Sequence, residues 1–416
     1  MHVGLNLIYL VPGQTGGMEV YARELAPRLA AMEELRVTAF VNREAAGEDF
    51  GCEQVVVPVD ATDRMQWVRG EQLLLPGLAE AHGCDVVHSL GSTAPIRGRF
   101  RRVVTIHDLH YKLVPDAHFG LRGLGMRVLV PAAARSAHRI IVDAASTRDD
   151  LHEHLGTPRG KVDVVPLAGA SPPDVEPTPE SEIRARYDLA DRPILLTVSA
   201  KRPHKNLLRL IEAVAALPEP RPVLVLPGYP TPHEAELRSR AAALGITDDV
   251  RFPAWVNAAD LEGLYAAAAA FVFPSLYEGF GLPVLEAMAR GVPVACSNRG
   301  ALAEVAGDAA LLFDPEAVGS IAAAMGRLLG DVARNKGAQG IAQSQRFSWE
   351  STAYATHGTY RRLRVDRVYH SQRLGACGAG EFEKGAATAS QGSRPRNWRR
   401  QTMRGLQVYG PERAVD

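Results

Sequence analysis

Short apolar runs alternate with helix-like stretches twice along the chain, and no other feature of the sequence restricts the fold as strongly. In the first half, the runs that we expect to be strands are residues 3–10, 36–41, 85–90, 102–108 and 139–142. Between them, helical spacing is present over residues 18–29, where Pro27 should kink the helix, and over residues 66–82. Strands that are apolar on both faces and alternate with helices are typical of a parallel sheet covered by helices on both sides.

A Pro-rich, acidic stretch at residues 171–182 separates the two halves, and its composition cannot form a helix interior or a central strand. The alternation then restarts, with apolar runs at residues 193–199, 222–228, 249–254, 269–275, 292–297 and 309–314. We therefore predict an α/β protein of two Rossmann-like, doubly wound parallel-sheet domains, 1–172 and 191–346, joined by a linker over 173–190. Two such domains face a cleft, and open α/β sheets bind ligands at the carboxyl ends of their strands. The alternative is two such domains with no shared site.

The C-terminal part of the chain divides into two segments. Residues 347–365 are amphipathic and predict a terminal helix, which we expect to pack back on the N-terminal domain. Residues 366–416 lose hydrophobic periodicity and are rich in Gly, Ser, Ala and Arg, so we expect a disordered tail. The basic stretch RPRNWRR (394–400) leaves binding to an anionic surface as the alternative.

Charge and cysteine usage exclude several classes of protein. Lys plus Arg and Asp plus Glu both number 47, so no overall field indicates a nucleic-acid partner. The four cysteines form no CxxC pair, which argues against a zinc site or a disulfide framework and favours a reducing cytoplasm. The N-terminus is typical of a first strand and not of a signal peptide, and the longest uncharged apolar run (265–273) is too short to span a membrane. We expect a soluble cytoplasmic protein, with contact at the inner face of the membrane as a further possibility.

The most specific pattern is FVFPSLYEGFGLPVLEAMARGVPVACS (271–297). It predicts a strand that ends at Pro274-Ser275, a Gly-bearing turn, and a helix that starts near Leu282-Pro283, where Pro suits the first turn. Free backbone N–H groups at the positive end of such a helix suit a phosphate or sugar oxygen. The residues expected to present them are Gly279, Phe280, Gly281 and Leu282.

Two glutamates flank this turn, eight positions apart. Glu286, about one turn into the helix, is expected to accept the hydroxyls of a ribose, as acidic residues do in other nucleotide sites. Glu278 lies in the turn and can accept hydroxyls of a transferred sugar. The spacing of two glutamates carries little information by itself; the complete string is far more specific.

The string EGFGLPVLE (278–286) resembles the E-x7-E signature of retaining glycosyltransferases of the GT-B fold, in particular the GT4 family. The resemblance covers roughly residues 1–365. It implies that the C-terminal domain binds a nucleotide diphosphate sugar and that the N-terminal domain binds the acceptor. It also implies that a hexosyl group is moved to an acceptor hydroxyl with retention of configuration, Glu278 positioning the sugar.

The segment VSAKRPHKNLLRLIEA (198–213) resembles the phosphate-binding stretch of that family, and Lys205 matches its lysine. A lysine there stabilises the charge that builds on the leaving diphosphate. Ser199-Ala200 stand where many members have a Gly-Arg or Gly-Thr pair, so Arg202 is expected to supply the second positive charge, with Lys201 as the weaker candidate. The alternative is that both are solvated surface charges.

Two N-terminal segments complete the resemblance. Gly16 and Gly17 match the family's glycine loop, expected to face the diphosphate across the cleft; in isolation such glycines are more often turn residues. His107 and Asp108 lie at the end of the expected strand 102–108, where the cleft should be. His107 matches a histidine that in this family contacts the donor sugar near the reacting centre, whereas His110 is expected not to face the site. The basic run 97–102 is interpreted as a solvated loop or, alternatively, as a contact for an anionic or lipid-linked acceptor.

No D-x-D triplet, which holds a metal ion in the other major glycosyltransferase fold, occurs in the chain, and we expect transfer without a metal or other cofactor. The partners expected are a nucleotide-sugar donor, whose base should contact residues 251–257, and a carbohydrate, lipid-linked or small-molecule acceptor. Two alternatives stay open. One is a nucleotide-sugar epimerase of the same fold, and the other is a non-catalytic nucleotide-sugar-binding protein.

Overall fold

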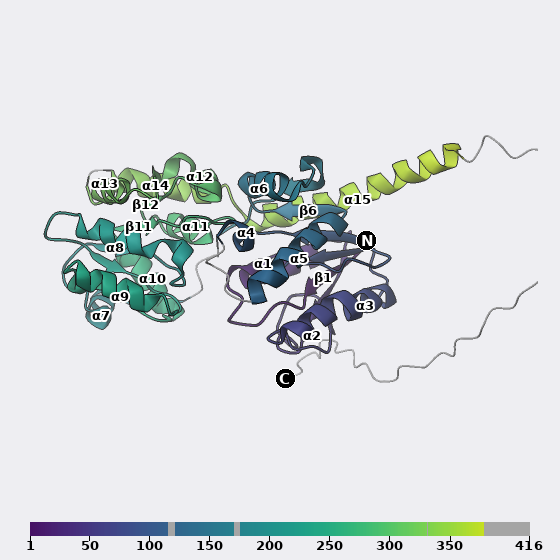
Figure 1. Cartoon of the computed structure of the whole chain (residues 1–416), viewed down its shortest axis with the longest axis horizontal. Helices are drawn as coiled ribbons and strands as arrows, with labels where there is room; N and C mark the ends of the chain where they lie inside the picture. The colour runs from purple at the N-terminus through teal and green to yellow at the C-terminus, as the bar shows by residue number, and fades with distance from the viewer. Residues whose placement is uncertain (115–120, 170–174, 331, 378–416) are drawn as a thin grey trace, which may run out of the picture.

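The computed structural model describes residues 1–114, 121–169, 175–330 and 332–377, which form two α/β domains, each built on a parallel sheet (Figure 1). The N-terminal sheet has seven strands in the order β3-β2-β1-β4-β5-β6-β7. In chain order these strands are β1 His2–Leu7, β2 Arg36–Val41, β3 Glu53–Val56, β4 Val86–Ser89, β5 Arg101–Thr105, β6 Arg139–Val142 and β7 Val162–Val164. The C-terminal sheet has six strands in the order β10-β9-β8-β11-β12-β13. These are β8 Ile194–Leu196, β9 Val223–Val225, β10 Val250–Arg251, β11 Ala270–Phe273, β12 Val294–Ser297 and β13 Leu311–Phe313.

The apolar runs of the sequence predict the positions of eleven of these strands, although the observed strands are mostly shorter than the runs. The strands β3 and β7 were not predicted. Both are short, and each carries a charged or polar residue among its valines, so neither forms an apolar run. Both lie at the edges of the sheet, where a side chain meets solvent more often than in a central strand.

Helices cover both faces of the N-terminal sheet. One face packs against α1 (Gly17–Ala30), and the other against α3 (Leu75–Ala81), α5 (Leu121–Ser136) and α6 (Ala145–Leu155). Pro27 lies inside α1, which continues through it. The predicted helix over 66–82 consists of α2 (Arg64–Arg69), a π-helical turn (Gly70–Leu74) and α3. The short α4 (His110–Leu113) follows β5.

The C-terminal sheet is covered in the same way. Its helices are α7 Glu180–Tyr187, α8 Leu207–Ala215, α9 Glu234–Ala243, α10 Ala258–Ala267, α11 Leu282–Ala289, α12 Gly300–Ala306, α13 Val318–Leu328 and α14 Ala333–Ser344. The predicted linker 173–190 therefore contains a helix, α7, in its second half. Its prolines end at Pro179, and the following ESEIRARY has no helix breaker, while Ile183 and Leu189 are buried.

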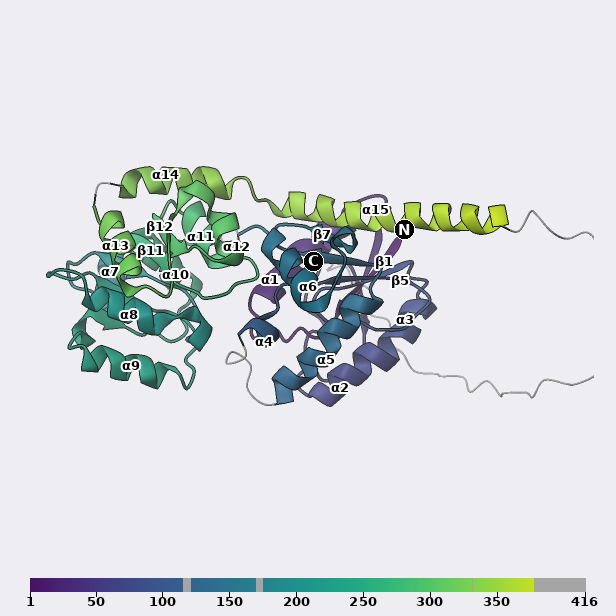
Figure 2. The same cartoon turned by 45° about the horizontal axis from the view of Figure 1, so that its top comes forward.

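The last helix is α15 (Trp349–Cys377), and its first part lies along the N-terminal domain in both views (Figures 1 and 2). Trp349 Nε1 donates to the carbonyl of Gly169 (3.2 Å), and the Tyr360 hydroxyl lies 2.6 Å from His88 Nδ1. This helix continues twelve residues beyond the predicted end at 365, because residues 366–377 hold no Pro and a single Gly to stop helix propagation. The remainder of the expected tail, 378–416, lies outside the described residues, as does its basic stretch.

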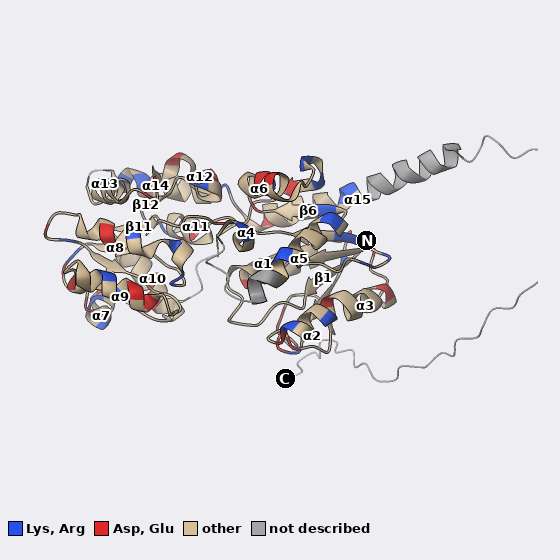
Figure 3. Ribbon diagram, viewed as in Figure 1, with Lys and Arg blue, Asp and Glu red and all other residues tan. Residues whose placement is uncertain are grey.

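Basic and acidic residues are interspersed on the helices of both domains (Figure 3). The described cysteines Cys52, Cys84 and Cys296 are free thiols. No helix in the described part of the chain is long and apolar enough to cross a membrane.

Candidate active site

A pocket of about 530 Å³ lies between the two domains. It is lined by the segments that follow the carboxyl ends of β1, β5, β6, β7, β8 and β11. In each sheet the chain reverses its direction across the sheet at one point, between β1 and β4 and between β8 and β11. Ligands of open α/β sheets bind at such points, because adjacent loops diverge there and leave a crevice. The two crevices face each other and form one pocket.

Glu278 lies in the loop between β11 and α11, beside Lys205 of the loop after β8. The Lys205 Nζ donates to Glu278 Oε1 at 2.6 Å, and the Ser275 hydroxyl donates to the same oxygen at 2.5 Å. Burial by itself raises the pKa of Glu278, but the charge of Lys205 and these hydrogen bonds hold it below its usual range. The sequence predicted both residues for the site, and the structure brings them into contact.

The turn before α11 has the form that the sequence predicts. Gly281 is the N-cap with φ of 112°, which a side chain would strain, and Pro283 lies in the first turn. Gly279 packs on the other domain: a Cβ there would lie 2.1 Å from the carbonyl oxygen of His107. Glycine therefore allows the loop to meet the N-terminal domain, and the residues from Gly279 to Leu282, Phe280 included, line the pocket.

Glu286 lines the same pocket from the second turn of α11. Its Oε2 accepts a hydrogen bond of 3.4 Å from the hydroxyl of Tyr265. Burial raises the pKa of Glu286, and the nearby Arg290 opposes that shift. Arg290 is itself held by Glu262, at 2.5 and 2.7 Å. Glu286 thus keeps carboxylate lone pairs for a ligand.

Arg202 and Lys201, the two candidates for the second positive charge, differ clearly. Arg202 lines the pocket, whereas Lys201 is not among the lining residues. Lys201 is fully buried and donates Nζ to the carbonyls of Gly228 (2.8 Å) and Pro253 (3.0 Å). Lys201 is therefore neither a pocket residue nor the solvated surface charge considered as an alternative, but a buried structural lysine.

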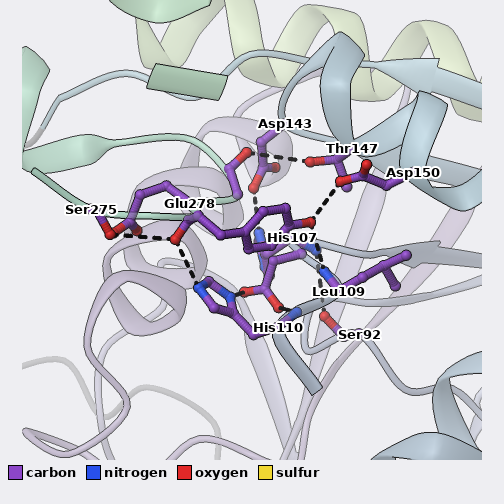
Figure 4. Close-up of polar contacts among 12 residues, drawn as sticks. Ser92, His107, Leu109, His110, Asp143, Thr147, Asp150, Ser275 and Glu278 are labelled. Carbon is purple, nitrogen blue, oxygen red and sulfur yellow. Dashed lines mark hydrogen bonds and ion pairs between the residues drawn. The ribbon is translucent and has the colours of Figure 1, made fainter. Parts of the chain in front are cut away.

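His107 lines the pocket with both ring nitrogens occupied. Its Nδ1 lies 2.7 Å from Asp143 Oδ2 (Figure 4). Its Nε2 lies 2.8 Å from the carbonyl oxygen of Leu90. Burial by itself lowers the pKa of His107, but the carboxylate of Asp143 outweighs it and raises the value to about 9. The histidine is therefore an imidazolium that donates on both sides.

His110 was expected not to face the site, and this prediction was wrong. It lines the pocket, with Nδ1 2.8 Å from Asp108 Oδ2 and Nε2 3.1 Å from the carbonyl oxygen of Tyr277. The residue begins α4, and this helical turn rotates its ring back toward the cleft. The ion pair lowers the pKa of Asp108, although burial opposes the shift.

The glycine loop reaches the pocket through Gly17, which lines it together with Thr15 and Met18. A Cβ on Gly17 would lie 3.3 Å from Leu282 of the facing domain. Gly16 is the N-cap of α1, with φ of 64°; it lies between the lining residues Thr15 and Gly17 but does not itself line the pocket. Gly17 thus faces the turn of α11 across the cleft.

Several pocket residues were missed. Asp143 directly follows the predicted strand 139–142, and that placement could have found it. Asp108 was placed at the cleft end of the predicted strand 102–108 but given no role, and it lines the pocket. His204 lines the pocket and is buried, with no recorded partner for its Nδ1 among the described residues. Burial and the adjacent Lys205 lower the pKa of His204 to about 3, so its ring is neutral.

Tyr277 links the two domains beside the pocket. Its hydroxyl donates to Asp150 Oδ2 at 2.8 Å and accepts from the backbone N–H of Leu109 at 3.2 Å (Figure 4).

Glu304 of α12 makes a second contact between the domains. It accepts a hydrogen bond of 2.9 Å from the backbone N–H of Ala145, at the N-terminus of α6. A carboxylate at this end of a helix is favourable, because the free N–H groups and the helix dipole are positive there.

Two further segments lie outside the pocket lining. The loop 251–257, expected to contact a base, has Trp255 69% exposed and packed on Tyr229 with ring centroids 4.8 Å apart. The basic run 97–102 includes the start of β5, and Arg102 donates to the carbonyls of Ser136 (3.0 Å) and Gly98 (3.2 Å).

Within the described residues, no group of three or more His, Cys, Asp or Glu side chains could hold a metal ion.

Comparison with known families matches both halves of the chain. Residues 179–342 match the family model of Glycosyl transferases group 1, and residues 15–168 match that of Glycosyltransferase Family 4. O-antigen chain mannosyltransferase B of Escherichia coli is 35% identical over 272 residues, which are 63% of this chain and 71% of that protein. D-inositol 3-phosphate glycosyltransferase of Streptomyces scabiei is 30% identical over 394 residues, which are 84% of this chain and 86% of that protein.

A solved structure shows the same fold. Anabaena Alr3699/HepE in complex with UDP-glucose superposes with a TM-score of 0.67 at 21% identity, over 87% of this chain and 100% of that chain. The strand alternation and the cleft that the sequence predicts are thus those of a known two-domain architecture.

Proposed function

The chain belongs to the group 1, family 4 glycosyltransferases of the GT-B fold, and from this we propose that it moves a hexosyl group from a nucleotide diphosphate sugar to an acceptor hydroxyl. We further propose that configuration at the transferred carbon is retained and that no metal ion is needed. The observation that carries the proposal is the Lys205–Glu278 pair beside the N-terminus of α11, at the point where strand order reverses.

The donor diphosphate would lie against the C-terminal side of the pocket, where Lys205 and Arg202 line it. Lys205, Arg202 and the first turn of α11 would stabilise the negative charge that grows on the leaving diphosphate. Gly17 would let the diphosphate approach α1 from the opposite side. This positive charge is the reason that we propose leaving-group stabilisation without a metal.

Glu286 would accept the ribose hydroxyls, because it is a buried carboxylate in the second turn of α11. Glu278 would position the transferred sugar and hold Lys205 for the leaving group. His107, fixed by Asp143 and Leu90, would act through its imidazolium charge close to the reacting centre. In the reaction the bond between the sugar C1 and the diphosphate breaks while the acceptor oxygen attacks the same face. The leaving phosphate oxygen then takes the acceptor's proton.

The relatives do not by themselves identify the acceptor, since one is named for an O-antigen chain and another for D-inositol 3-phosphate. The Anabaena protein was solved with UDP-glucose, which makes UDP-glucose and the mannose donor GDP-mannose the first donors to test.

The test is a transfer assay with purified protein, each donor and a panel of sugar acceptors, with the product anomer assigned by NMR. We expect nucleoside diphosphate release coupled to product of unchanged anomeric configuration, at the same rate with and without EDTA. An inverted product would refute retention, and activity lost in EDTA and restored by Mn²⁺ would refute metal independence. Turnover of the donor to its epimer without an acceptor would indicate the epimerase alternative.

A further inference from the structure

The N-terminal wall of the pocket carries four ionisable side chains arranged as two pairs, His107 with Asp143 and His110 with Asp108. Under the proposed function this wall faces the acceptor, because Lys205, Arg202 and α11 all belong to the other wall. Its charges therefore bear on which acceptors fit.

The imidazole N–H groups of this wall are already used. His107 contacts Asp143 (2.7 Å) and the Leu90 carbonyl (2.8 Å). His110 contacts Asp108 (2.8 Å) and the Tyr277 carbonyl (3.1 Å). A phosphate group is bound by free N–H donors, most strongly by cationic ones, and each histidine has only two ring nitrogens to offer. Neither has a donor left for a phosphate.

Among the described residues, no other cation on this side of the pocket replaces them. The described N-terminal residues that line the pocket include no Lys or Arg. Lys112, two residues after His110, donates Nζ to the carbonyl of His154 (2.6 Å) and is not among the lining residues. A phosphate placed here would lie beside the Asp108 carboxylate, while the charges of His107 and His110 are already paired with Asp143 and Asp108, which is unfavourable in a partly desolvated cleft.

Asp108 is the most accessible of the four ionisable side chains, 34% exposed compared with 2% for Asp143. Its Oδ1 accepts from the backbone N–H of His110 (2.9 Å) and its Oδ2 from the ring. Each carboxylate oxygen has a second lone pair, so Asp108 can accept a further hydrogen bond from a hydroxyl. The same charge repels an anion.

We propose that Asp108 selects a neutral sugar hydroxyl as the acceptor and excludes acceptors that carry a phosphate on the ring that enters the pocket. The inference rests on the proposed function and names the acceptor class of the same site. Specificity of this kind combines an attractive contact for one ligand with a repulsive one against its rival.

The test compares matched pairs of acceptors under one donor. The neutral acceptors are methyl α-D-mannopyranoside, methyl α-D-glucopyranoside and myo-inositol. Their phosphorylated partners are the 6-phosphates of the two methyl glycosides and myo-inositol 3-phosphate. For the wild type we expect kcat/KM to be about 100-fold higher with the better neutral acceptors than with their phosphorylated partners. Asp108→Lys should shift that ratio toward the phosphorylated partner by at least about tenfold, and Asp108→Asn should shift it by less.

Asp149→Asn is the matched control, because Asp149 lies on α6 outside the pocket lining. It should leave the ratio unchanged, and thermal unfolding should show that all variants are folded. A phosphorylated acceptor used as well as its neutral partner would overturn the inference. The inference would also be overturned if Asp108→Asn and Asp108→Lys left the ratio of kcat/KM for neutral and phosphorylated acceptors unchanged. Hydrolysis of the donor with no transfer to any neutral acceptor would overturn it as well. A protein that neither binds nucleoside diphosphates nor consumes a donor would instead refute the proposed function, and the inference with it.

Discussion

Lys205 Nζ lies 2.6 Å from Glu278 Oε1, and this ion pair joins the loops that follow β8 and β11, the two strands between which the C-terminal sheet reverses. Both side chains are largely buried, so the lysine is held in one place before any ligand arrives. A pre-positioned cation stabilises developing charge without reorganising during the reaction. The pair therefore connects the proposed sugar-binding residue with the proposed diphosphate-binding residue.

Replacing Lys205 by Ala should lower kcat by about 10²–10³-fold, because one pre-organised donor to the leaving group is removed. Steady-state transfer with the best donor measures this. The matched control is Lys336→Ala, since Lys336 is partly exposed on α14, lies outside the pocket lining, and its Nζ donates to the carbonyl of Asp308. If Lys205→Ala is as active as the control variant, Lys205 takes no part in the transfer reaction.

Replacing Glu278 by Ala should also lower kcat by about 10²-fold or more, but should leave nucleoside diphosphate affinity within about threefold of the wild type. The reason is that Lys205 keeps its positive charge when it loses its carboxylate partner, which favours binding of another anion. Calorimetric titration with the nucleoside diphosphate separates binding from transfer. Equal losses of affinity and of transfer would show that Glu278 serves the diphosphate and not the sugar.

The pKa of His107, on the N-terminal wall of the pocket, predicts that the stability of the fold depends on pH. The folded-state pKa of His107, about 9, is above the unfolded value of 6.5, so its contribution is complete below pH 6.5 and is lost as pH rises through 9. Asp143→Asn should lower the free energy of unfolding at pH 6 by about 3 kcal/mol, because it leaves a buried imidazolium without its partner. Urea unfolding at pH 6 and at pH 9.5 measures both effects.

The difference in free energy of unfolding between the wild type and Asp143→Asn should become smaller between pH 6 and pH 9.5. Asp149→Asn provides the control here as well, since Asp149 is half exposed and its pairs with Arg148 and Arg159 are on the surface. A difference between wild type and Asp143→Asn that is the same at both pH values would contradict the assignment of a charged His107.

Tyr277→Phe should loosen the contact between the domains, because it removes the hydrogen bonds to Asp150 and to the N–H of Leu109 and keeps the ring. We expect a larger radius of gyration by small-angle scattering and a kcat reduced by about tenfold, equivalent to two lost hydrogen bonds of about 0.7 kcal/mol each. Tyr354→Phe is the control, because Tyr354 is 69% exposed on α15. Unchanged scattering together with unchanged kcat would show that Tyr277 does not hold the domains together.

The sequence predicts the fold closely because the central strands of a parallel sheet are buried on both faces and therefore appear in the sequence as apolar runs. Eleven strands overlap those runs, but β3 and β7 do not, since an edge strand needs fewer apolar residues. The site was predicted where glycines and charges are local to one turn, as at Glu278 and Gly281. The errors concern side-chain direction and burial: a single helical turn at α4 brings His110 into the pocket, and packing buries Lys201. Neither effect is visible in the order of residues.

The measurement that tests the account most directly is the shift in melting temperature that nucleoside diphosphates cause in the wild type and in Lys205→Ala. Ligand that binds only the native state raises the apparent stability, by about 2.7 kcal/mol at a concentration 100 times Kd. We predict that at least one of GDP, UDP and dTDP raises the Tm of the wild type and that the same nucleotide has little effect on Lys205→Ala. If none of them, alone or as its hexose conjugate, shifts the wild type, or if Lys205→Ala responds equally, the pocket between the domains is not a nucleotide-sugar site.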